Sequence, residues 1–151
     1  MPKTIAGKTS RRFVLDSSMT MAWLFRDESS SYTYSIRRSL KRYQAVVTML
    51  WPYEVANVIY IGWKRQRCTS ADIATWLRIL STFPIEVQPI QVKSLMSELV
   101  NMAMRHQLTV YDASYLELAW RTGLPIASLD NRINEEAMKL GIARFDPDGL
   151  L

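Results

Sequence analysis

Short apolar runs alternate with helical segments along this chain, and this alternation constrains the fold more than any other feature. The runs with the length of buried strands span residues 13–15, 45–48, 83–90, 125–129 and 143–145. Apolar residues recur at helical spacing between them, in segments 19–25, 31–42, 52–66, 70–80, 92–105, 111–121 and 131–140. Strands that alternate with helices favour a parallel sheet whose two faces are both covered by helices. The sequence therefore predicts an α/β fold.

Length and composition predict one globular domain. The chain has 151 residues, of which 48% are hydrophobic and 22% are charged, and a chain of this size buries a core without disulfides. We expect the domain to span residues 13–151 and to follow a basic N-terminal arm, residues 1–12. The arm lacks the apolar centre of a secretory signal, and no apolar run reaches the length of a membrane span. We therefore expect a cytoplasmic location.

Two rare residues limit the catalytic chemistry. Cys68 is the only cysteine and His106 the only histidine, so an internal disulfide and a zinc cluster of cysteines and histidines are both excluded. A mechanism of the Ser–His–Asp type would depend entirely on His106.

Charge favours a polyanionic partner. Lys and Arg number 19 and Asp and Glu number 14, which gives a net charge of +5. If a metal ion bound four of the acids, 19 cations would face 10 acids, a balance of +9. Such a surface suits nucleic acid, although a solvated basic surface explains the composition equally well. The candidate phosphate contacts are Arg37, Arg38, Lys41 and Arg42, or Lys64, Arg65 and Arg67.

Two aspartates follow apolar strands directly. Asp16 ends the run at 13–15, and Asp130 ends the run at 125–129. The carboxyl ends of parallel strands are where α/β sheets place ligand-binding groups. Each aspartate also precedes a helical segment, so helix capping explains either one alone.

Two further acids fall in the first turns of helices and share their apolar stripes. Thr109 is a candidate N-cap for the helix that contains Asp112, and Asp112 is aligned with Tyr115, three residues on. Pro52 suits the first position of its helix and would make Glu54 the third residue, with no Ser or Thr at the cap to form a capping box. For Asp112, helix capping and metal binding are equally good explanations.

The same periodicity makes three predictions about burial. Glu117 projects about 140° away from Asp112 around the helix, so we expect a surface acid there. Leu77 and Met96 fall on the apolar stripes of their helices, so we expect both to face the core.

One kind of site, a divalent-cation site, explains all four acids together. Asp16, Glu54, Asp112 and Asp130 all stand at ends of elements that one sheet could bring together. Anions packed closely raise each other's pKa, and a divalent cation relieves their repulsion. An oxygen-only ligand set selects Mg²⁺ or Mn²⁺, which can activate water to attack a phosphodiester. The pattern therefore predicts a metal-dependent nuclease.

These motifs also carry a family resemblance. The segments VLDSS, WPYEVANV, VYDASYLELA and ASLD, which contain the four acids in this order, resemble those of PIN domains in the VapC branch of toxin–antitoxin ribonucleases. The resemblance extends from Phe13 to Phe145. It implies a three-layer α/β/α sandwich with a central, mainly parallel sheet. It also implies an endoribonuclease dependent on Mg²⁺ or Mn²⁺, and a homodimer that a separate cognate antitoxin protein neutralises.

The resemblance assigns roles to particular residues. It implies that Asp16, Glu54, Asp112 and Asp130 are the catalytic and metal-binding acids. Ser128, where many relatives have Thr, would orient an acid or a metal-bound water, and Ser17 would do likewise. The arm before Phe13 is longer than the usual start of the family.

Other functions compete with this interpretation. A haloacid-dehalogenase-like phosphatase needs a second Asp two residues after the first, and position 18 is Ser. A DNA-directed nuclease is the closest rival because bound carboxylates do not distinguish the sugar. A housekeeping nuclease and a non-catalytic nucleic-acid-binding module remain further alternatives.

Overall fold

Four parallel strands form the centre of the molecule. The computed structural model describes residues 11–89 and 92–151, so most of the expected N-terminal arm lies outside the described residues. The strands are β1 (Arg12–Leu15), β2 (Gln44–Val47), β3 (Ile85–Val87) and β4 (Ile126–Ala127), in the order β3-β2-β1-β4. All their pairings are parallel, which confirms the α/β prediction. The run at 143–145 contributes one parallel bridge, between Ile126 and Arg144.

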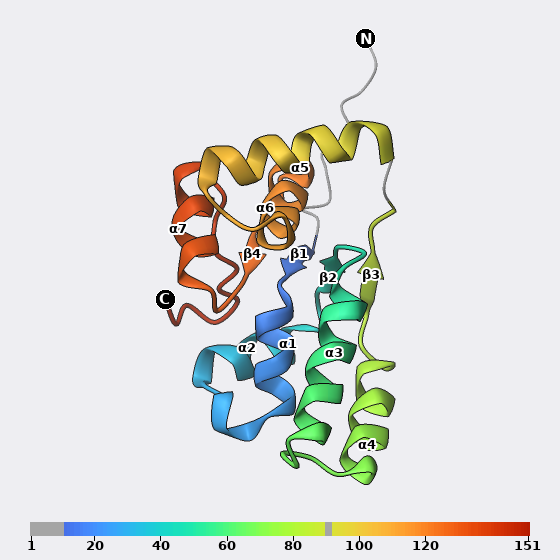
Figure 1. Ribbon diagram of the computed structural model, residues 1–151. Coiled ribbons are helices and arrows are strands. Elements are labelled where there is room, and N and C mark those ends of the chain that lie inside the picture. Colours follow the sequence, from blue (N-terminus) through green and yellow to red (C-terminus); the bar gives the residue numbers. More distant parts are fainter. Residues whose placement is uncertain (1–10, 90–91) are drawn as a thin grey trace.

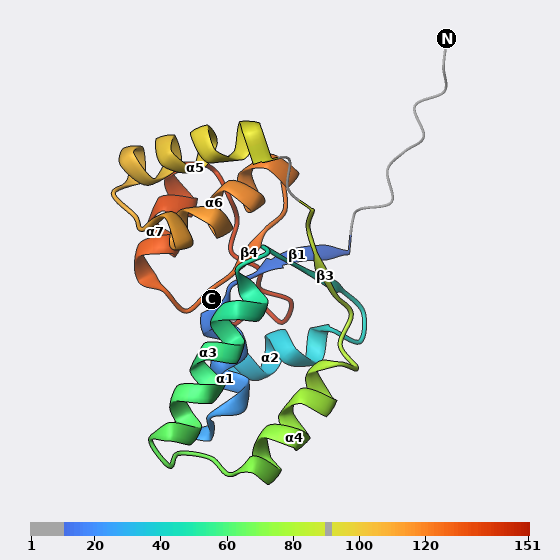
Figure 2. The same cartoon turned by 45° about the vertical axis from the view of Figure 1, so that its right-hand side comes forward.

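Helices lie on both sides of this sheet. They are α1 (Ser17–Leu24), the 3₁₀ helix η1 (Arg26–Glu28), α2 (Ser31–Ser39), α3 (Trp51–Lys64), α4 (Ser70–Leu80), α5 (Val92–His106), α6 (Val110–Thr122) and α7 (Asn131–Lys139). In Figures 1 and 2, α5, α6 and α7 gather above the strands, while α1 to α4 lie below them. The three-layer arrangement agrees with the sequence-based expectation.

Alternation along the strands produces two separate cores. Phe13 and Leu15 point to the face that α1 and α2 cover, where they pack with Met19 and Ile36. Val14, between them in the chain, points to the opposite face and belongs to the core formed with α6 and α7. A strand buried on both faces must be apolar at every position, which explains the continuous apolar run before Asp16.

Helix α6 packs against other elements on two sides, and one of its acids is buried as a result. Tyr115 and Leu116 pack on the sheet core, whereas α5 packs on another side of α6. The prediction that Glu117 is a surface acid is wrong: its exposed fraction is 4%. Arg121, one turn later, neutralises it through Nε at 2.7 Å from Oε1.

The other two burial predictions are also wrong. Leu77 is 53% exposed and Met96 is 62% exposed. Helix α4 has no buried residue: it stands at one side of α3 (Figure 2), where Ile73, Trp76 and Leu80 are only partly buried against the core that contains Phe25 and Ile59. Among the described residues, no helix combines the length and apolarity that crossing a bilayer requires.

Candidate active site

Asp16 lies at the carboxyl end of β1, where the chain enters α1. Its exposed fraction is 4%. Its Oδ2 accepts two hydrogen bonds, from Ser18 Oγ at 2.6 Å and from Ser128 Oγ at 2.7 Å. Burial raises the pKa of Asp16 to about 6; the two serine hydrogen bonds oppose the rise, and the charges of Glu54 and Asp112 add to it. The carboxylate is therefore held in place but poorly compensated.

Glu54 approaches from the first turn of α3. Trp51 is the first helical residue and Leu50 the N-cap, so Glu54 stands one position later in the helix than expected. Its Oε2 accepts a hydrogen bond from Ser17 Oγ at 3.2 Å. Its Oε1 accepts one from the Tyr115 hydroxyl at 2.5 Å. Both oxygens are thus oriented by neighbouring elements.

Asp112 stands in the first turn of α6, but the capping is done by Thr109. The Asp112 backbone N–H donates to Thr109 Oγ1 at 3.1 Å, and Gly123 ends the helix in the left-handed conformation, as predicted. Since Thr109 satisfies the helix end, helix capping does not explain the Asp112 carboxylate. That carboxylate instead contributes to raising the pKa of Asp16.

Ser128 connects Asp130 to this group. Ser128 is fully buried and donates to Asp16, while its Oγ accepts the backbone N–H of Asp130 at 3.0 Å. The Asp130 carboxylate caps α7 by accepting the Ile133 N–H at 3.1 Å. The structure therefore gives Asp130 the capping role that the sequence left open, next to the residue that fixes Asp16.

The charges of these four acids lack a basic partner within the part of the chain that the structure describes. Within residues 11–89 and 92–151, no Lys or Arg forms an ion pair with Asp16, Glu54, Asp112 or Asp130. Their oxygen-only chemistry suits a hard divalent cation, and no described donor occupies Asp16 Oδ1. In the described part of the chain, however, no three acidic, His or Cys side chains stand in a ready-made metal site. The excess of negative charge at this edge of the sheet does not depend on the rotamers of these side chains, and it contributes to the raised pKa of Asp16.

Two hydroxyl residues of the site were missed in the sequence. Ser18 holds Asp16 Oδ2 and accepts the Leu129 N–H at 3.1 Å, so it ties the ends of β1 and β4 together. Tyr115 was assigned only to the apolar stripe of its helix. A signal for Tyr115 existed, because a buried tyrosine needs a partner for its hydroxyl and an acid lies three residues before it.

The lone histidine lies elsewhere. His106 Nδ1 is 2.7 Å from Glu136 Oε2 in a buried contact between α5 and α7. Glu136 also accepts from Lys139 Nζ at 2.7 Å. This histidine therefore has a structural partner of its own and takes no part in the Asp16 group.

A pocket of about 360 Å³ lies between α3, α5 and α6. The α6 residues that line it include Ser114, Glu117 and Arg121. At 100° per residue, these project from the side of the helix opposite Asp112. The pocket is therefore separate from the candidate active site.

One group of candidate phosphate contacts is poorly placed. Lys41 and Arg42 precede β2, which starts at Gln44. In a parallel sheet the start of β2 lies at the edge opposite the end of β1, where Asp16 stands. Arg38 is engaged with Asp148.

Together these features define an α/β protein with a cluster of uncompensated carboxylates at the carboxyl edge of a parallel sheet. No family model matches the chain. Ribonuclease VapC3 of Pyrobaculum aerophilum is 26% identical to this chain over 126 residues. This alignment covers 83% of this chain and 94% of that protein. The crystal structure of PAE2754 from Pyrobaculum aerophilum matches 89% of this chain and 98% of its own, with a TM-score of 0.55 and 21% identity. The structural similarity supports the fold, and the sequence similarity supports the resemblance to VapC ribonucleases.

Proposed function

We propose that this chain is an endoribonuclease toxin of the VapC type that depends on Mg²⁺ or Mn²⁺. The observation that carries the proposal is the group of Asp16, Glu54 and Asp112: the charges of Glu54 and Asp112 contribute to raising the pKa of Asp16, and no Lys or Arg of the described residues forms an ion pair with any of the three. The name of the relative, Ribonuclease VapC3, supports a nuclease.

The residues present suit a hard cation. Asp16, Glu54 and Asp112 would hold it, and Asp130 would join them from the start of α7. When bound, the ion supplies an activated water and stabilises charge that develops on a phosphodiester. Its positive charge would also offset the repulsion that contributes to the raised pKa of Asp16.

The protein's own residues have complementary tasks. Ser18 and Ser128 keep Asp16 Oδ2 turned toward the protein, so Oδ1 is available to a ligand. The net charge of +5 favours an RNA backbone as substrate. Lys64 and Arg65 are the other candidate contacts: they lie at the end of α3, about 15 Å along the helix from Glu54, so an RNA strand that extends along α3 would reach them.

The resemblance extends the proposal to partners and location. The chain would work in the cytoplasm as a homodimer, and a separate antitoxin protein would block it. Acidic residues of such a partner could follow the basic surface while an arginine reaches the carboxylates and competes with the metal.

The test is cleavage of RNA by the purified protein. We expect cleavage with MgCl₂ or MnCl₂ and none in EDTA, and we expect Asp112→Asn to reduce the rate by about 10³-fold or more without loss of the fold. Asp27→Asn, which removes an acid of the same type outside the site, is the matched control and should cleave normally. Full activity in EDTA, or undiminished cleavage by Asp112→Asn, would eliminate the proposed mechanism. Cleavage of DNA in preference to RNA would favour the rival nuclease.

A further inference from the structure

Tyr115 is buried completely, and its one polar atom reaches the candidate active site. The side chain has an exposed fraction of 0% and packs with Val14 and Val46 on the sheet. Its hydroxyl donates to Glu54 Oε1 at 2.5 Å. Since Tyr115 lies three residues after Asp112 on α6, one helix presents both an acid of the site and a donor to another acid.

Glu54 is held from two sides. Tyr115 contacts Oε1 from α6, and Ser17 contacts Oε2 from α1 at 3.2 Å. A free glutamate on a helix samples many rotamers, and ordering it costs conformational entropy. Here two donors on two other elements restrict the carboxylate before any ligand arrives. Each carboxylate oxygen has two lone pairs, so it can accept one hydrogen bond and still bind a cation.

The tyrosine is a neutral donor, because a phenol hydroxyl carries its proton at neutral pH. It orients Glu54 through the 2.5 Å hydrogen bond without neutralising the charge of the carboxylate.

From this geometry we infer that Tyr115 is a positioning residue for Glu54: its hydroxyl, with Ser17 opposite, presets the carboxylate for a divalent cation. The inference rests on the proposed function, because it assumes that Glu54 meets a metal ion. It adds a residue that acts on the metal through Glu54 and never touches the metal itself.

The test compares two buried tyrosines. Tyr115→Phe removes the hydroxyl and keeps the ring, and MnCl₂ binding is measured by calorimetry on folded protein. Loss of a hydrogen-bond partner of a metal ligand typically weakens metal affinity 10- to 100-fold, roughly, and we expect a loss in this range. Tyr32→Phe is the matched control: Tyr32 is also buried, its hydroxyl donates to the Phe145 carbonyl at 2.9 Å, and it belongs to the core on the other face of the sheet. The control should bind Mn²⁺ like the wild type.

Two further measurements separate positioning from general structure. In a Glu54→Gln background, Tyr115→Phe should weaken Mn²⁺ binding no further, because the residue acts through Glu54. RNA cleavage by Tyr115→Phe should recover as MnCl₂ is raised, which a structural defect would not do. Wild-type affinity in folded Tyr115→Phe, or an equal loss in the Glu54→Gln background, would overturn the inference.

The remaining outcomes are also decisive. If Tyr115→Phe does not fold, NMR of the wild type replaces it: paramagnetic Mn²⁺ should broaden the ring signals of Tyr115 before those of Tyr32, and unaffected Tyr115 signals would overturn the inference. If the wild type binds Mn²⁺ and Asp112→Asn does not, but Tyr115→Phe binds normally, only the positioning role fails. If the wild type binds no Mn²⁺, the proposed function fails and the positioning role with it.

Discussion

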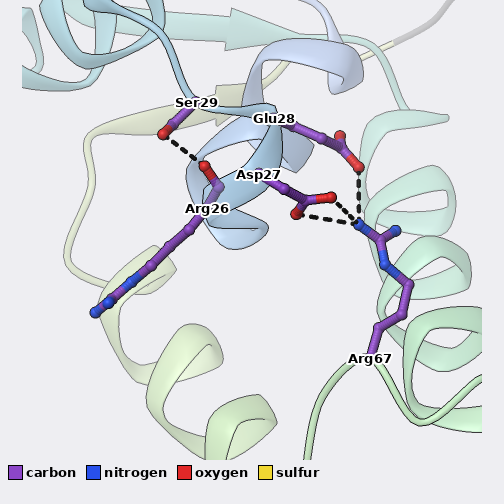
Figure 3. Close-up of polar contacts among 5 residues, drawn as sticks. All are labelled: Arg26, Asp27, Glu28, Ser29 and Arg67. Atoms are coloured by element: carbon purple, nitrogen blue, oxygen red, sulfur yellow. Dashed lines mark hydrogen bonds and ion pairs between the residues drawn. The ribbon is translucent and has the colours of Figure 1, made fainter.

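One aspartate lies just before helix α1 and another lies shortly after it, and the two differ in burial and in charge compensation. Asp16 before the helix is buried, and no described lysine or arginine pairs with it. Asp27 after the helix is in η1, where its side chain is 73% exposed and Arg67 Nη2 lies 3.0 Å from its Oδ2. Figure 3 shows how Arg67 also reaches Glu28, at 3.2 Å, so that one guanidinium holds both acids.

The difference separates structural acids from the candidate site. Arg67 stacks on the Phe25 ring at 4.2 Å and ties η1 to the end of α3. Even the buried Glu117 has Arg121. Arg67 and Arg121 thus compensate Asp27, Glu28 and Glu117, whereas no Lys or Arg of the described residues forms an ion pair with Asp16, Glu54 or Asp112. Such an arrangement costs stability and is typical of functional sites.

The largest expected effect is on growth. Induced expression of the wild type without a partner should arrest growth if the site cleaves cellular RNA, whereas Asp16→Ala or Asp112→Ala should leave growth normal. Asp27→Ala is the matched control and should arrest growth as the wild type does. Growth curves at equal protein levels check this, and co-expression of the protein encoded immediately upstream should rescue growth and co-purify. If the wild type and Asp112→Ala are equally harmless, the toxin interpretation fails.

A smaller effect should appear in the stability of the metal-free protein. The pKa of Asp16 rises from 3.8 to about 6 on folding, so between these values the folded state binds the proton more tightly than the unfolded state. The free energy of unfolding should therefore fall as the pH rises through this window and then level off. Relative to Asp16→Asn, the wild type should lose on the order of 2–3 kcal/mol.

Urea unfolding in EDTA at about pH 4 and about pH 7 measures this difference. Asp27→Asn should show no such gain at neutral pH, because Arg67 already compensates Asp27. A neutral-pH stability of Asp16→Asn at or below that of the wild type would mean that the Asp16 charge is compensated after all.

Much of the site follows from local sequence. Asp16 could be predicted because a doubly buried strand must be apolar and must then end in a polar residue at the edge of the sheet. Thr109 and Gly123 mark the ends of α6 by backbone chemistry alone. These features depend only on residues close by in the sequence, so the packing of helices against one another does not change them.

The failures share a different cause. A prediction from helical periodicity assumes that one side of each helix faces solvent. It therefore placed Glu117 at the surface, although α5 packs on that side of α6. The same assumption predicted that Leu77 faces the core, but only Ile73, Trp76 and Leu80 of this stripe pack there, and Leu77 is 53% exposed. The contacts of Tyr115 with Glu54 and of Arg67 with Asp27 join residues 61 and 40 positions apart. Such pairings depend on how helices dock, and spacing along one helix does not encode that.

The smallest expected effect concerns the compensated acids. Arg67→Met keeps the aliphatic stem over Phe25 but removes the charge that holds Asp27 and Glu28 (Figure 3). Because the ion pairs are exposed and screened by solvent, we expect a decrease of a few degrees at most in Tm, and the decrease should shrink as NaCl is raised. RNA cleavage should fall only if Arg67 also contacts the substrate, and Asp27→Asn, which leaves the cation in place, separates these two roles. A large loss of stability that salt does not reduce would mean that Arg67 acts mainly by packing on Phe25, and the contrast between the two ends of α1 would then concern burial rather than charge.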